Sequence, residues 1–291
     1  MNYKPLIQQA LAEDIGHGDI TTDAIVDSKT KATAMIKTKQ ELVLAGIDVA
    51  RDVFLELDPK IKWEALHEDG DFIKKGKSIA TLEGSAAGIL KGERTALNFL
   101  QHLSGIATLT KQFVDAVGGT KTKILDTRKT LPGWREIEKY AVKMGGGKNH
   151  RQGLFDRYLV KNNHIDMAGG IKEAIEKVLT LRPFDRLRAS GDESERGSGR
   201  AVSVEVEVRN FEELKIALQY PIDIVLLDNF EPEAVRGAMR LAHGKVKFEV
   251  SGGITLDNVA LYAATKVDFI SVGALTHSAP AVDMHLVMQT S

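Results

Sequence analysis

The chain has no cysteine, no strong net charge and no long apolar run. The missing cysteine excludes disulfides, thiolate metal sites and cysteine nucleophiles. A formal net charge of -1 over 291 residues argues against a general binder of nucleic acid or of membrane surfaces. No apolar stretch approaches the roughly 20 residues of a membrane helix. The first residues form an amphipathic, acid-containing stretch rather than a signal peptide, so we expect a globular enzyme of the cytoplasm.

Positive charge is nevertheless concentrated in one stretch of the sequence. Residues 128–161 contain nine Lys or Arg and only three acids, a local net charge of +6. The glycine triplet 145–147 lies in the middle of this stretch, where backbone without side chains can come close to a ligand. Concentrated cations beside glycine indicate a pocket for a small, highly anionic molecule.

The first third of the chain predicts a mixed α/β domain. Residues 3–13 predict a helix, and residues 31–83 read as short strands with turns around one helix. Apolar residues at helical spacing in 92–117 predict one or two further helices.

From residue 123 onward the pattern changes to alternating strands and helices. Strands with β-branched residues followed by helices predict a parallel sheet, and right-handed crossovers would close it, or nearly close it, into a barrel. Strands are predicted at 123–126, 157–161, 202–208, 223–228, 247–251 and 268–273, and helices at 133–144, 169–181, 211–219, 231–242 and 256–265.

One segment interrupts this alternation. Residues 182–200 are polar and rich in Gly, Ser and charge, with no apolar period. A helix-to-strand connection normally needs about two to six residues. We therefore expect a solvated, disordered insertion, with a functional lid or a partner-binding arm as the alternative.

Polar residues follow the predicted strands at their carboxyl ends, where barrel enzymes carry their active residues. A charge on a central strand is costly unless it is paired or faces a wet pocket. Side chains alternate along a strand, so Glu205 and Glu207 share one face of theirs. The other strand-end residues are Thr127, Arg128, Lys129, Lys161, Asp228, Ser251, Gly252, Gly253, Gly273 and Ala274.

The last two strand ends predict a phosphate site. The sequence SGGIT at 251–255 and the sequence VGALTHS at 272–278 each place glycine before a predicted helix. Free backbone N–H groups and the helix dipole bind phosphate at such positions. Barrel enzymes often use their final two strand–helix loops for this purpose.

Long motifs in this order resemble the quinolinate phosphoribosyltransferase family over nearly the whole chain. They include LAEDIGHGDITT (11–22), GERTALNFLQHLSGIAT (92–108), DTRKTLPG (126–133), EKYAVKMGGGKNHR (138–151), LVKNNHI (159–165), VEVEV (204–208), LLDNF (226–230), SGGIT (251–255) and VDFISVGALTHSAPAVDM (267–284). Residues 182–200 look longer than the family's connection, and position 148 varies in the family, so Lys148 receives no role.

The resemblance implies an α/β fold with an N-terminal α/β sandwich and an open barrel of about six to seven parallel strands. We expect the sandwich at 1–107, the catalytic barrel at 108–275, and a tail at 276–291 that packs back on the N-terminal domain. The resemblance also implies a homodimer, or dimers assembled further, in which the partner's N-terminal domain completes each pocket.

The implied reaction joins quinolinate to the ribose of phosphoribosyl pyrophosphate, with loss of pyrophosphate and carbon dioxide. The product is nicotinate mononucleotide, on the route to NAD. By resemblance, Arg128 and Arg151 bind the quinolinate carboxylates with Lys161 and His150 beside them, because the arginine fork suits planar carboxylates. Arg94 matches the family's arginine that reaches across the dimer interface.

The resemblance assigns catalytic roles to Lys129, Glu207 and Asp228. Lys129 faces the pyrophosphate or the bond that breaks. Glu207 and Asp228 hold the ribose hydroxyls and help to position Mg²⁺ on the diphosphate, since carboxylates suit that cation. Glu205 shares their face but lies deeper, so it ranks second. The 5′-phosphate is assigned to Ser251, Gly252, Gly253, Gly273 and Ala274, and the remaining substrate-binding positions are Thr127 and Val272.

Two alternatives stay open. A related enzyme could use nicotinate or another acid as the acceptor, although a single carboxylate needs fewer cations than this chain supplies. A non-catalytic barrel could bind a phosphate metabolite without chemistry, although Lys129, Glu207 and Asp228 argue against it. The proton donor to C2 after decarboxylation also stays open between Lys129, Lys161 and water.

Overall fold

The computed structural model describes residues 1–181 and 202–290, so the predicted insertion at 182–200 lies outside the described residues. The chain forms two compact units that interleave in sequence. The first contains Met1–Gln112, Lys129–Gly147 and the chain from Ala274 onward, and the second contains Phe113–Arg128 and Lys148–Gly273. The domain boundaries predicted after residues 107 and 275 stay predictions, because compactness is a different criterion from independent folding.

The first unit is built on an antiparallel sheet with the strand order β12-β1-β5-β3. Strand β1 alternates between exposed and buried residues, the period expected when one face of a sheet is covered. Strand β12 comes from the end of the chain and pairs with β1 along its length, from Thr38↔Met284 to Ala32↔Thr290. The strands are β1 (Lys31–Thr38), β3 (Lys62–Ala65), β5 (Ser78–Ser85) and β12 (Met284–Thr290), with the short pair β2 (Leu42–Val43) and β4 (Phe72–Ile73).

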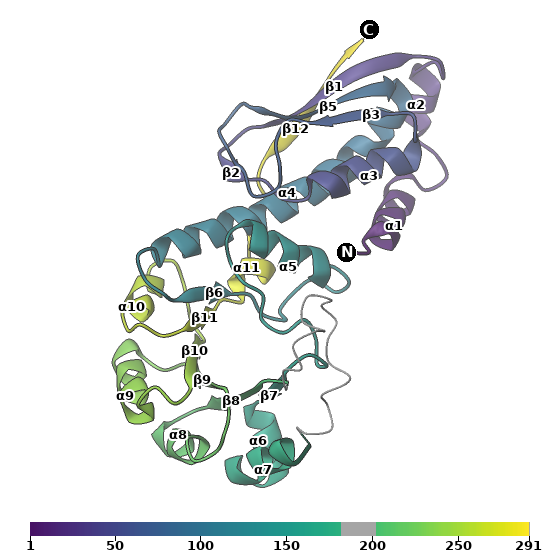
Figure 1. The fold of residues 1–291 in the computed structure, drawn as a ribbon. Helices are drawn as coiled ribbons and strands as arrows, with labels where there is room; N and C mark the ends of the chain where they lie inside the picture. The colour runs from purple at the N-terminus through teal and green to yellow at the C-terminus, as the bar shows by residue number, and fades with distance from the viewer. Residues whose placement is uncertain (182–201, 291) are drawn as a thin grey trace. The chain divides into compact units, whose positions relative to one another are not determined.

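Helices complete this unit, as Figure 1 shows. The longest, α4, is a single helix of 31 residues, where the sequence left one or two helices open. Its buried apolar residues, among them Phe99, Leu100 and Leu103, belong to the core of this unit. The helices are α1 (Lys4–Ile15), α2 (Ile20–Ile25), α3 (Ile47–Leu57), α4 (Ala86–Ala116), α5 (Arg135–Met144) and α11 (Ala274–His277).

The glycine triplet 145–147 has a packing role that the sequence did not indicate. A Cβ atom on Gly145 would overlap the carbonyl oxygen of Ala107 and the side chain of Thr110, both on α4. A Cβ atom on Gly147 would overlap Val142 and Thr110. These two glycines therefore let the end of α5 approach α4 closely, which corrects our interpretation of the triplet as backbone left bare for a ligand.

The second unit contains the predicted parallel sheet, with six strands in the order β6-β11-β10-β9-β8-β7. All five strand pairs are parallel. The sheet curves, with its helices on the outside, and β6 and β7 form its two edges (Figure 1). The predicted open barrel is thus confirmed. The strands are β6 (Lys123–Leu125), β7 (Tyr158–Val160), β8 (Val204–Val208), β9 (Ile224–Asp228), β10 (Lys247–Ser251) and β11 (Phe269–Ser271).

The helices of this unit differ from prediction in two places. The predicted helix at 169–181 is preceded by a separate helix, and Gly169 with φ of 94° and Gly170 with φ of 149° divide the two. The predicted helix at 256–265 is shorter than expected. The helices are α6 (Asn162–Ala168), α7 (Ile171–Leu181), α8 (Phe211–Ala217), α9 (Pro232–Ala242) and α10 (Val259–Ala263). No helix among the described residues is long and apolar enough to cross a membrane.

The edge strand β6 has a short extension that the sequence did not predict. The backbone of Lys148 bridges to Leu125 in parallel, donates to the carbonyl of Ile124 at 2.9 Å and accepts from Asp126 at 3.2 Å. The buried Asp126 then accepts a 2.8 Å hydrogen bond from the backbone N–H of His150. The chain that carries His150 and Arg151 is therefore fixed beside β6.

Candidate active site

The carboxyl edge of the parallel sheet brings most of the predicted site residues together. Neighbouring strands are in parallel register there, as in the pair Ser251↔Asp228. Predicted site residues that end a strand, follow one or lie beside β6 within this unit are Thr127, Arg128, His150, Arg151, Lys161, Glu207, Asp228, Ser251, Gly252, Gly253, Val272 and Gly273.

Three predicted site residues belong to the other unit. Arg94 is an exposed residue of α4, and Ala274 begins α11. Lys129 is exposed and follows Arg128 directly in the chain. Its backbone carbonyl accepts a 2.7 Å hydrogen bond from the hydroxyl of Thr276, which fixes the main chain on which this lysine is carried.

Glu207 is the most buried acid of the predicted catalytic set, with 7% exposure. Its Oε1 accepts a hydrogen bond from the backbone N–H of Asn162 at 3.3 Å, and its Oε2 lies 3.8 Å from Nζ of Lys161. Burial raises the pKa of Glu207, and the negative charges of Asp228 and Glu205 raise it further. These acids are therefore close enough to repel one another, a repulsion that a cation or hydroxyl donors would relieve.

Arg151 and Arg128 form the corresponding cationic pair. Arg151 is only 7% exposed. Burial lowers its pKa most, and the positive charge of Arg128 lowers it next. A bound carboxylate would relieve the repulsion between the two guanidinium groups and could accept their N–H donors.

The loop after β10 has a backbone that requires glycine. Gly252 and Gly253 have φ values of 97° and 61°, in the left-handed region. A Cβ atom on Gly252 would also overlap the side chain of Asn229, which follows β9. Asn258 fixes the far side of the loop, donating to the carbonyl of Gly253 and accepting from the backbone of Thr255, both at 2.9 Å.

The helices behind the two predicted phosphate loops are short. Helix α10 covers five residues and α11 covers four. The dipole of so short a helix is small, so helix dipoles do not support the predicted phosphate site. What remains in support of the prediction is a loop whose conformation depends on glycine, and the backbone amides of such loops can bind phosphate by direct hydrogen bonds.

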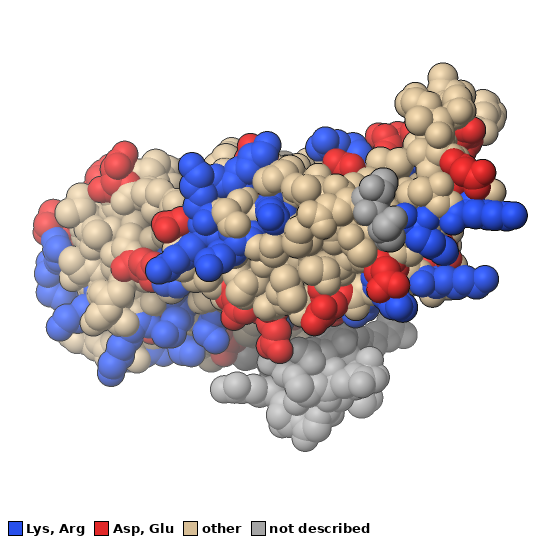
Figure 2. All heavy atoms as spheres, turned by 90° about the horizontal axis from the view of Figure 1, so that it is seen from above, with Lys and Arg blue, Asp and Glu red and all other residues tan. Residues whose placement is uncertain are grey.

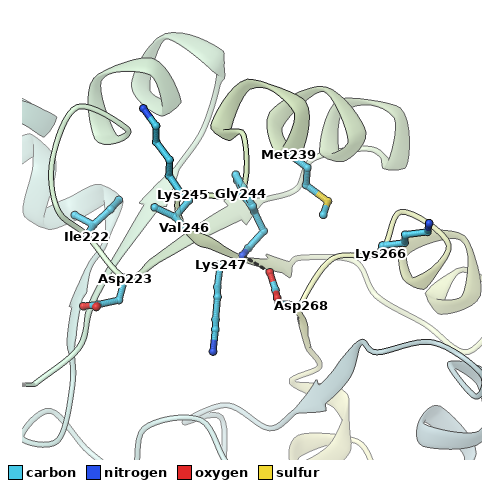
Figure 3. Close-up of a pocket in the computed structure, with 10 residues that line it drawn as sticks. Ile222, Asp223, Met239, Gly244, Lys245, Val246, Lys247, Lys266 and Asp268 are labelled. Carbon is cyan, nitrogen blue, oxygen red and sulfur yellow. Dashed lines mark hydrogen bonds between the residues drawn. The ribbon is translucent and has the colours of Figure 1, made fainter. Parts of the chain in front are cut away.

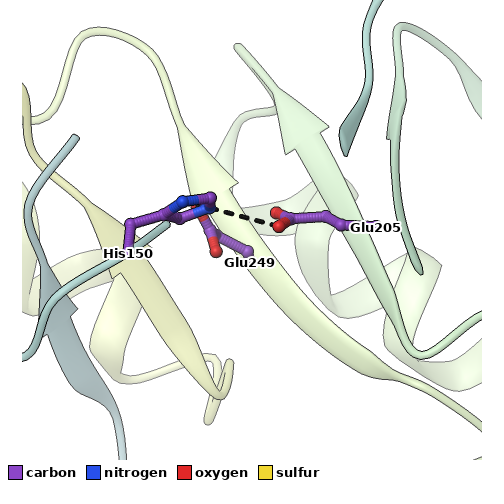
Figure 4. Close-up of side chains that lie close together, drawn as sticks. All are labelled: His150, Glu205 and Glu249. Carbon is purple, nitrogen blue, oxygen red and sulfur yellow. Dashed lines mark ion pairs between the residues drawn. The ribbon is translucent and has the colours of Figure 1, made fainter. Parts of the chain in front are cut away.

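His150 faces a pair of buried carboxylates. Its Nε2 lies 3.1 Å from Oε2 of Glu205 and 3.5 Å from Oε1 of Glu249, as Figure 4 shows. The His150 side chain is 8% exposed and the two acids are 0% and 1% exposed. The guanidinium of Arg157 lies 3.2 Å from Glu205 as well. Glu249 was not among the predicted residues, although it lies between two apolar residues and two residues before Ser251 on the same strand, as Glu205 does before Glu207.

A cavity of about 550 Å³ lies at the opposite, amino-terminal ends of the strands. Its acids are already used, because Asp223 accepts from the backbone of Val204 and Asp268 from that of Phe248. Figure 3 shows Lys245, Lys247 and Lys266 pointing in different directions, so no common anion site forms there.

Lys and Arg side chains are numerous in this chain, 39 in all. Figure 2 shows one group of Lys and Arg on the face that it draws. Positive charge alone therefore does not locate the site. The distinguishing features of the carboxyl edge are the buried Arg151, buried acids and a glycine loop after a strand.

Two family models together match almost the whole chain. They are the quinolinate phosphoribosyl transferase N-terminal domain, over residues 19–104, and the C-terminal domain of the same family, over residues 106–287. The chain belongs to the quinolinate phosphoribosyltransferase family. The resemblance predicted from the motifs is confirmed, and with it the fold class.

Relatives of this family are similar along their full lengths. The nicotinate-nucleotide pyrophosphorylase [carboxylating] of Mycobacterium leprae is 42% identical, over 96% of this chain and 95% of its own. The probable enzyme of the same name from Bacillus subtilis is 39% identical, over 98% and 93%. The solved structure of the nicotinate-nucleotide pyrophosphorylase from Francisella tularensis has a TM-score of 0.88 and 44% identity, over 98% of this chain and 95% of that one.

Proposed function

We propose that this chain transfers the phosphoribosyl group of phosphoribosyl pyrophosphate to quinolinate and releases carbon dioxide and pyrophosphate. The product is nicotinate mononucleotide, for NAD biosynthesis. The observation that carries the proposal is the match to carboxylating nicotinate-nucleotide pyrophosphorylases over nearly the full length of the chain. The chemistry of the carboxyl edge supports it, because the edge offers the buried Arg151, further cations and buried acids to two anionic substrates.

Positively charged side chains bind the acceptor, quinolinate. The Arg128 and Arg151 guanidinium groups bind the two carboxylates of quinolinate as planar forks. Lys161 adds a point charge, and its amino group lies 3.8 Å from Glu207, which keeps it near the acidic part of the site. Quinolinate contacts little of the His150 ring, because that side chain is only 8% exposed.

Acidic side chains and the glycine loops bind the donor, phosphoribosyl pyrophosphate. Glu207 and Asp228 accept hydrogen bonds from the ribose hydroxyls. The backbone amides of the loops at 251–253 and 272–274 bind the 5′-phosphate, with the Ser251 hydroxyl as a further donor. Lys129 interacts with the pyrophosphate or with the bond that breaks.

Magnesium fits the same acids. Glu207 and Asp228 supply hard carboxylate oxygens, and the raised pKa of Glu207 reflects, in part, negative charge that a cation would balance. When bound on the diphosphate, Mg²⁺ supplies charge neutralisation for the leaving group.

The transfer step breaks the bond between C1 of the ribose and the pyrophosphate oxygen. The electron pair leaves with pyrophosphate, and the quinolinate nitrogen forms the new bond to C1. Positive charge builds on the ribose ring as the bond breaks. The carboxylates of Glu207 and Asp228 stabilise that charge electrostatically.

Decarboxylation follows from the new bond. The ring nitrogen is now cationic, so it stabilises the electron pair that stays on C2 when the 2-carboxylate leaves as carbon dioxide. A proton then adds to C2, from Lys129, Lys161 or water. The site's contribution is to hold the second carboxylate fixed while the first departs.

We propose that the active form is a homodimer, or a higher assembly of dimers, in which Arg94 of one chain reaches the site of the other. This part of the proposal rests on the family resemblance. Location in the cytoplasm belongs to the proposal as well, and fractionation of cells that express the tagged chain would test it.

A pyrophosphate-release assay tests the proposed reaction. Release should require quinolinate, phosphoribosyl pyrophosphate and Mg²⁺ together, with one carbon dioxide per pyrophosphate. Each component is omitted in turn as the control. Equal or better turnover with nicotinate would show that the acceptor is a monoacid rather than quinolinate. Binding of both substrates without pyrophosphate release would make the chain a non-catalytic binding barrel.

A further inference from the structure

The buried cluster around His150 is a set of polar groups that the proposed reaction does not use. Glu205 comes from β8 and Glu249 from β10, two strands that β9 separates in the sheet. Their side chains meet at one imidazole because the sheet curves around them (Figure 4). Barrel interiors are usually filled by layers of apolar side chains from alternate strands. Charged side chains at this position destabilise the folded state relative to apolar ones, which indicates that they serve a function.

The hydrogen bonds of His150 define its tautomer. The backbone N–H of Arg151 donates to Nδ1 of His150 at 2.7 Å. A backbone N–H is always a donor, so Nδ1 is the acceptor and carries no proton. The proton of the ring therefore lies on Nε2, the atom that faces Glu205 at 3.1 Å and donates a hydrogen bond to it.

These contacts form a continuous connection across the barrel interior. Glu205 on β8 holds the His150 ring, and the ring holds the backbone of Arg151. Asp126, which follows β6, holds the backbone of His150 at 2.8 Å. The segment that carries Arg151 is thus fixed at two points, one beside the edge strand β6 and one inside the barrel.

Glu205 is held firmly enough to serve as an anchor. Burial by itself would raise the pKa of Glu205, but the hydrogen bond from His150 and the charge and hydrogen bond of Arg157 lower it. The carboxylate therefore stays an ionised acceptor. Glu249 lies behind it and accepts a hydrogen bond from the hydroxyl of Ser271, which orients the second acid.

We propose that Glu205 is a positioning residue for the acceptor site: through the His150 ring, it fixes the segment from which Arg151 binds a substrate carboxylate. Glu205 touches no substrate in this role. It keeps the imidazole in the tautomer and orientation that accept from the Arg151 backbone. This inference rests on the proposed role of Arg151, and combined variants separate the two.

The same three residues could be mistaken for a metal site. Their ligand atoms lie within 4.8 Å of one another. However, a protonated Nε2 has no lone pair for a metal, and the lone pair of Nδ1 is used by Arg151. The guanidinium of Arg157 already donates to Oε2 of Glu205, the oxygen that also faces Nε2 of His150. The geometry therefore favours positioning over metal binding.

The test measures KM for quinolinate, KM for phosphoribosyl pyrophosphate and kcat in four variants of the full-length enzyme. Glu205→Gln keeps an acceptor but loses the charge, and Glu205→Leu loses both. His150→Asn keeps an acceptor near the Nδ1 position but no longer reaches Glu205. Ser271→Ala is the control, because it changes a buried hydrogen bond of the same cluster without touching His150.

We expect KM for quinolinate to rise about tenfold in Glu205→Leu and in His150→Asn, the loss typical when a supporting hydrogen bond behind a binding group is removed. Glu205→Gln should recover part of this loss, because its amide oxygen can still accept from Nε2. KM for the donor should change less than about twofold in all variants, and Ser271→Ala should leave both values unchanged within that range. A double variant, Glu205→Leu with His150→Asn, should be no worse than either single variant, since both break one connection.

Combination with Arg151→Lys separates this inference from the proposed function. Arg151→Lys should itself raise KM for quinolinate, and Glu205→Leu should then add little. Additive effects of Glu205→Leu and Arg151→Lys, or a larger effect on the donor than on quinolinate, would overturn the positioning role while leaving the role of Arg151 intact. If Arg151→Lys changes only donor binding, the proposed role of Arg151 fails and the inference fails with it.

Folding and metal content complete the test. Glu205→Leu removes the partner of the partly buried Arg157, so each variant is checked by circular dichroism and thermal unfolding. If Glu205→Leu does not fold, Glu205→Gln and His150→Asn decide the outcome by the same kinetic criteria. Stoichiometric Zn²⁺ or Mn²⁺ in the purified protein that disappears in His150→Asn would assign the cluster to a metal and overturn the inference.

Discussion

A Cβ atom on Gly252 would overlap the side-chain amide of Asn229. The two residues follow the neighbouring strands β10 and β9, and the backbone N–H of Asn229 donates to the carbonyl of Ser251 at 2.9 Å. Asn229 has a φ of 57° and Gly252 a φ of 97°, so both loops turn through the left-handed region at the point where they meet. The two adjoining strand ends therefore depend on each other's conformation.

This contact predicts a selective effect of Gly252→Ala. The added methyl group must displace Asn229 or distort the loop that offers its amides to the 5′-phosphate. We expect KM for phosphoribosyl pyrophosphate to rise by about tenfold or more, with a smaller change for quinolinate. Steady-state kinetics with each substrate varied will measure this.

Gly244→Ala is the matched control for that variant. Gly244 precedes the same strand, β10, and its φ of 75° imposes similar backbone strain, but nothing lies within 4 Å of an added Cβ. This variant should lose stability without a change in donor KM. An equal rise in donor KM for both variants would mean that backbone strain, rather than the contact with Asn229, is responsible.

Loss of the Arg128 guanidinium should impair the use of quinolinate much more than the binding of phosphoribosyl pyrophosphate. Arg128→Ala leaves a substrate carboxylate without its partner in a site shared with the buried Arg151. We expect a loss of about 3 kcal/mol in quinolinate use, on the order of 100-fold, with a much smaller change in donor binding. Arg128→Lys should give an intermediate loss, because it keeps the charge but not the two parallel donors. An equal fall in affinity for the donor would contradict the assignment.

The buried Glu249 should make folding stability depend on pH. Burial, followed by the charge of Glu205, raises its pKa well above the ordinary value of 4.5. Between 4.5 and the raised value, the folded chain holds a proton that the unfolded chain has released. The free energy of unfolding should therefore fall as the pH rises through this window.

The variant Glu249→Gln should remove that contribution. Its free energy of unfolding should fall less steeply than that of the unmodified chain from about pH 4.5 upward, as measured by urea unfolding at a series of pH values. Glu212→Gln, at a side chain that is 79% exposed, is the control for loss of a carboxyl group. Parallel stability curves for Glu249→Gln and the unmodified chain would show that Glu249 is ionised in the folded state.

Mixing two inactive variants should restore activity if Arg94 serves the site of a second chain. Arg94→Ala and Lys129→Ala each disable one of the contributions to a site. A mixed dimer would contain one site with both substitutions and one with neither. Random exchange of equal amounts should then recover about a quarter of the original activity. Variants that exchange subunits yet recover nothing would place Arg94 in the site of its own chain.

Strand positions could be predicted from the sequence because each strand is a short segment in which apolar residues are either consecutive or alternate with polar ones. All six predicted strands of the second unit are present, with ends that differ by two residues or fewer. The helices were less predictable. Helix α6, which Gly169 and Gly170 separate from α7, was not predicted, and only 259–263 of the predicted helix 256–265 is helical. Boundaries of this kind depend on single glycine residues and on tertiary packing, which a periodic pattern does not encode.

The positions of candidate site residues could be predicted where a polar residue lies at or near the end of a strand. Lys161, Glu207, Asp228 and Ser251 all meet this criterion, because parallel strands bring their carboxyl ends to one edge. Glu249 and the direction of the His150 ring were not predicted. Both depend on which side chains meet inside a curved sheet, and the two acids at that ring come from strands that are not neighbours, β8 and β10.

The sequence by itself determined the family, the order of strands and helices and the residue types at the strand ends, because these follow from local patterns and long motifs. Only the tertiary structure decided that Gly145 and Gly147 pack against α4 and that Asn229 fills the space beside Gly252. It also decided that His150 turns toward two buried acids. The physical reason is that close packing and buried hydrogen bonds join residues from distant strands, and their partners become defined only when the sheet curves and closes around them.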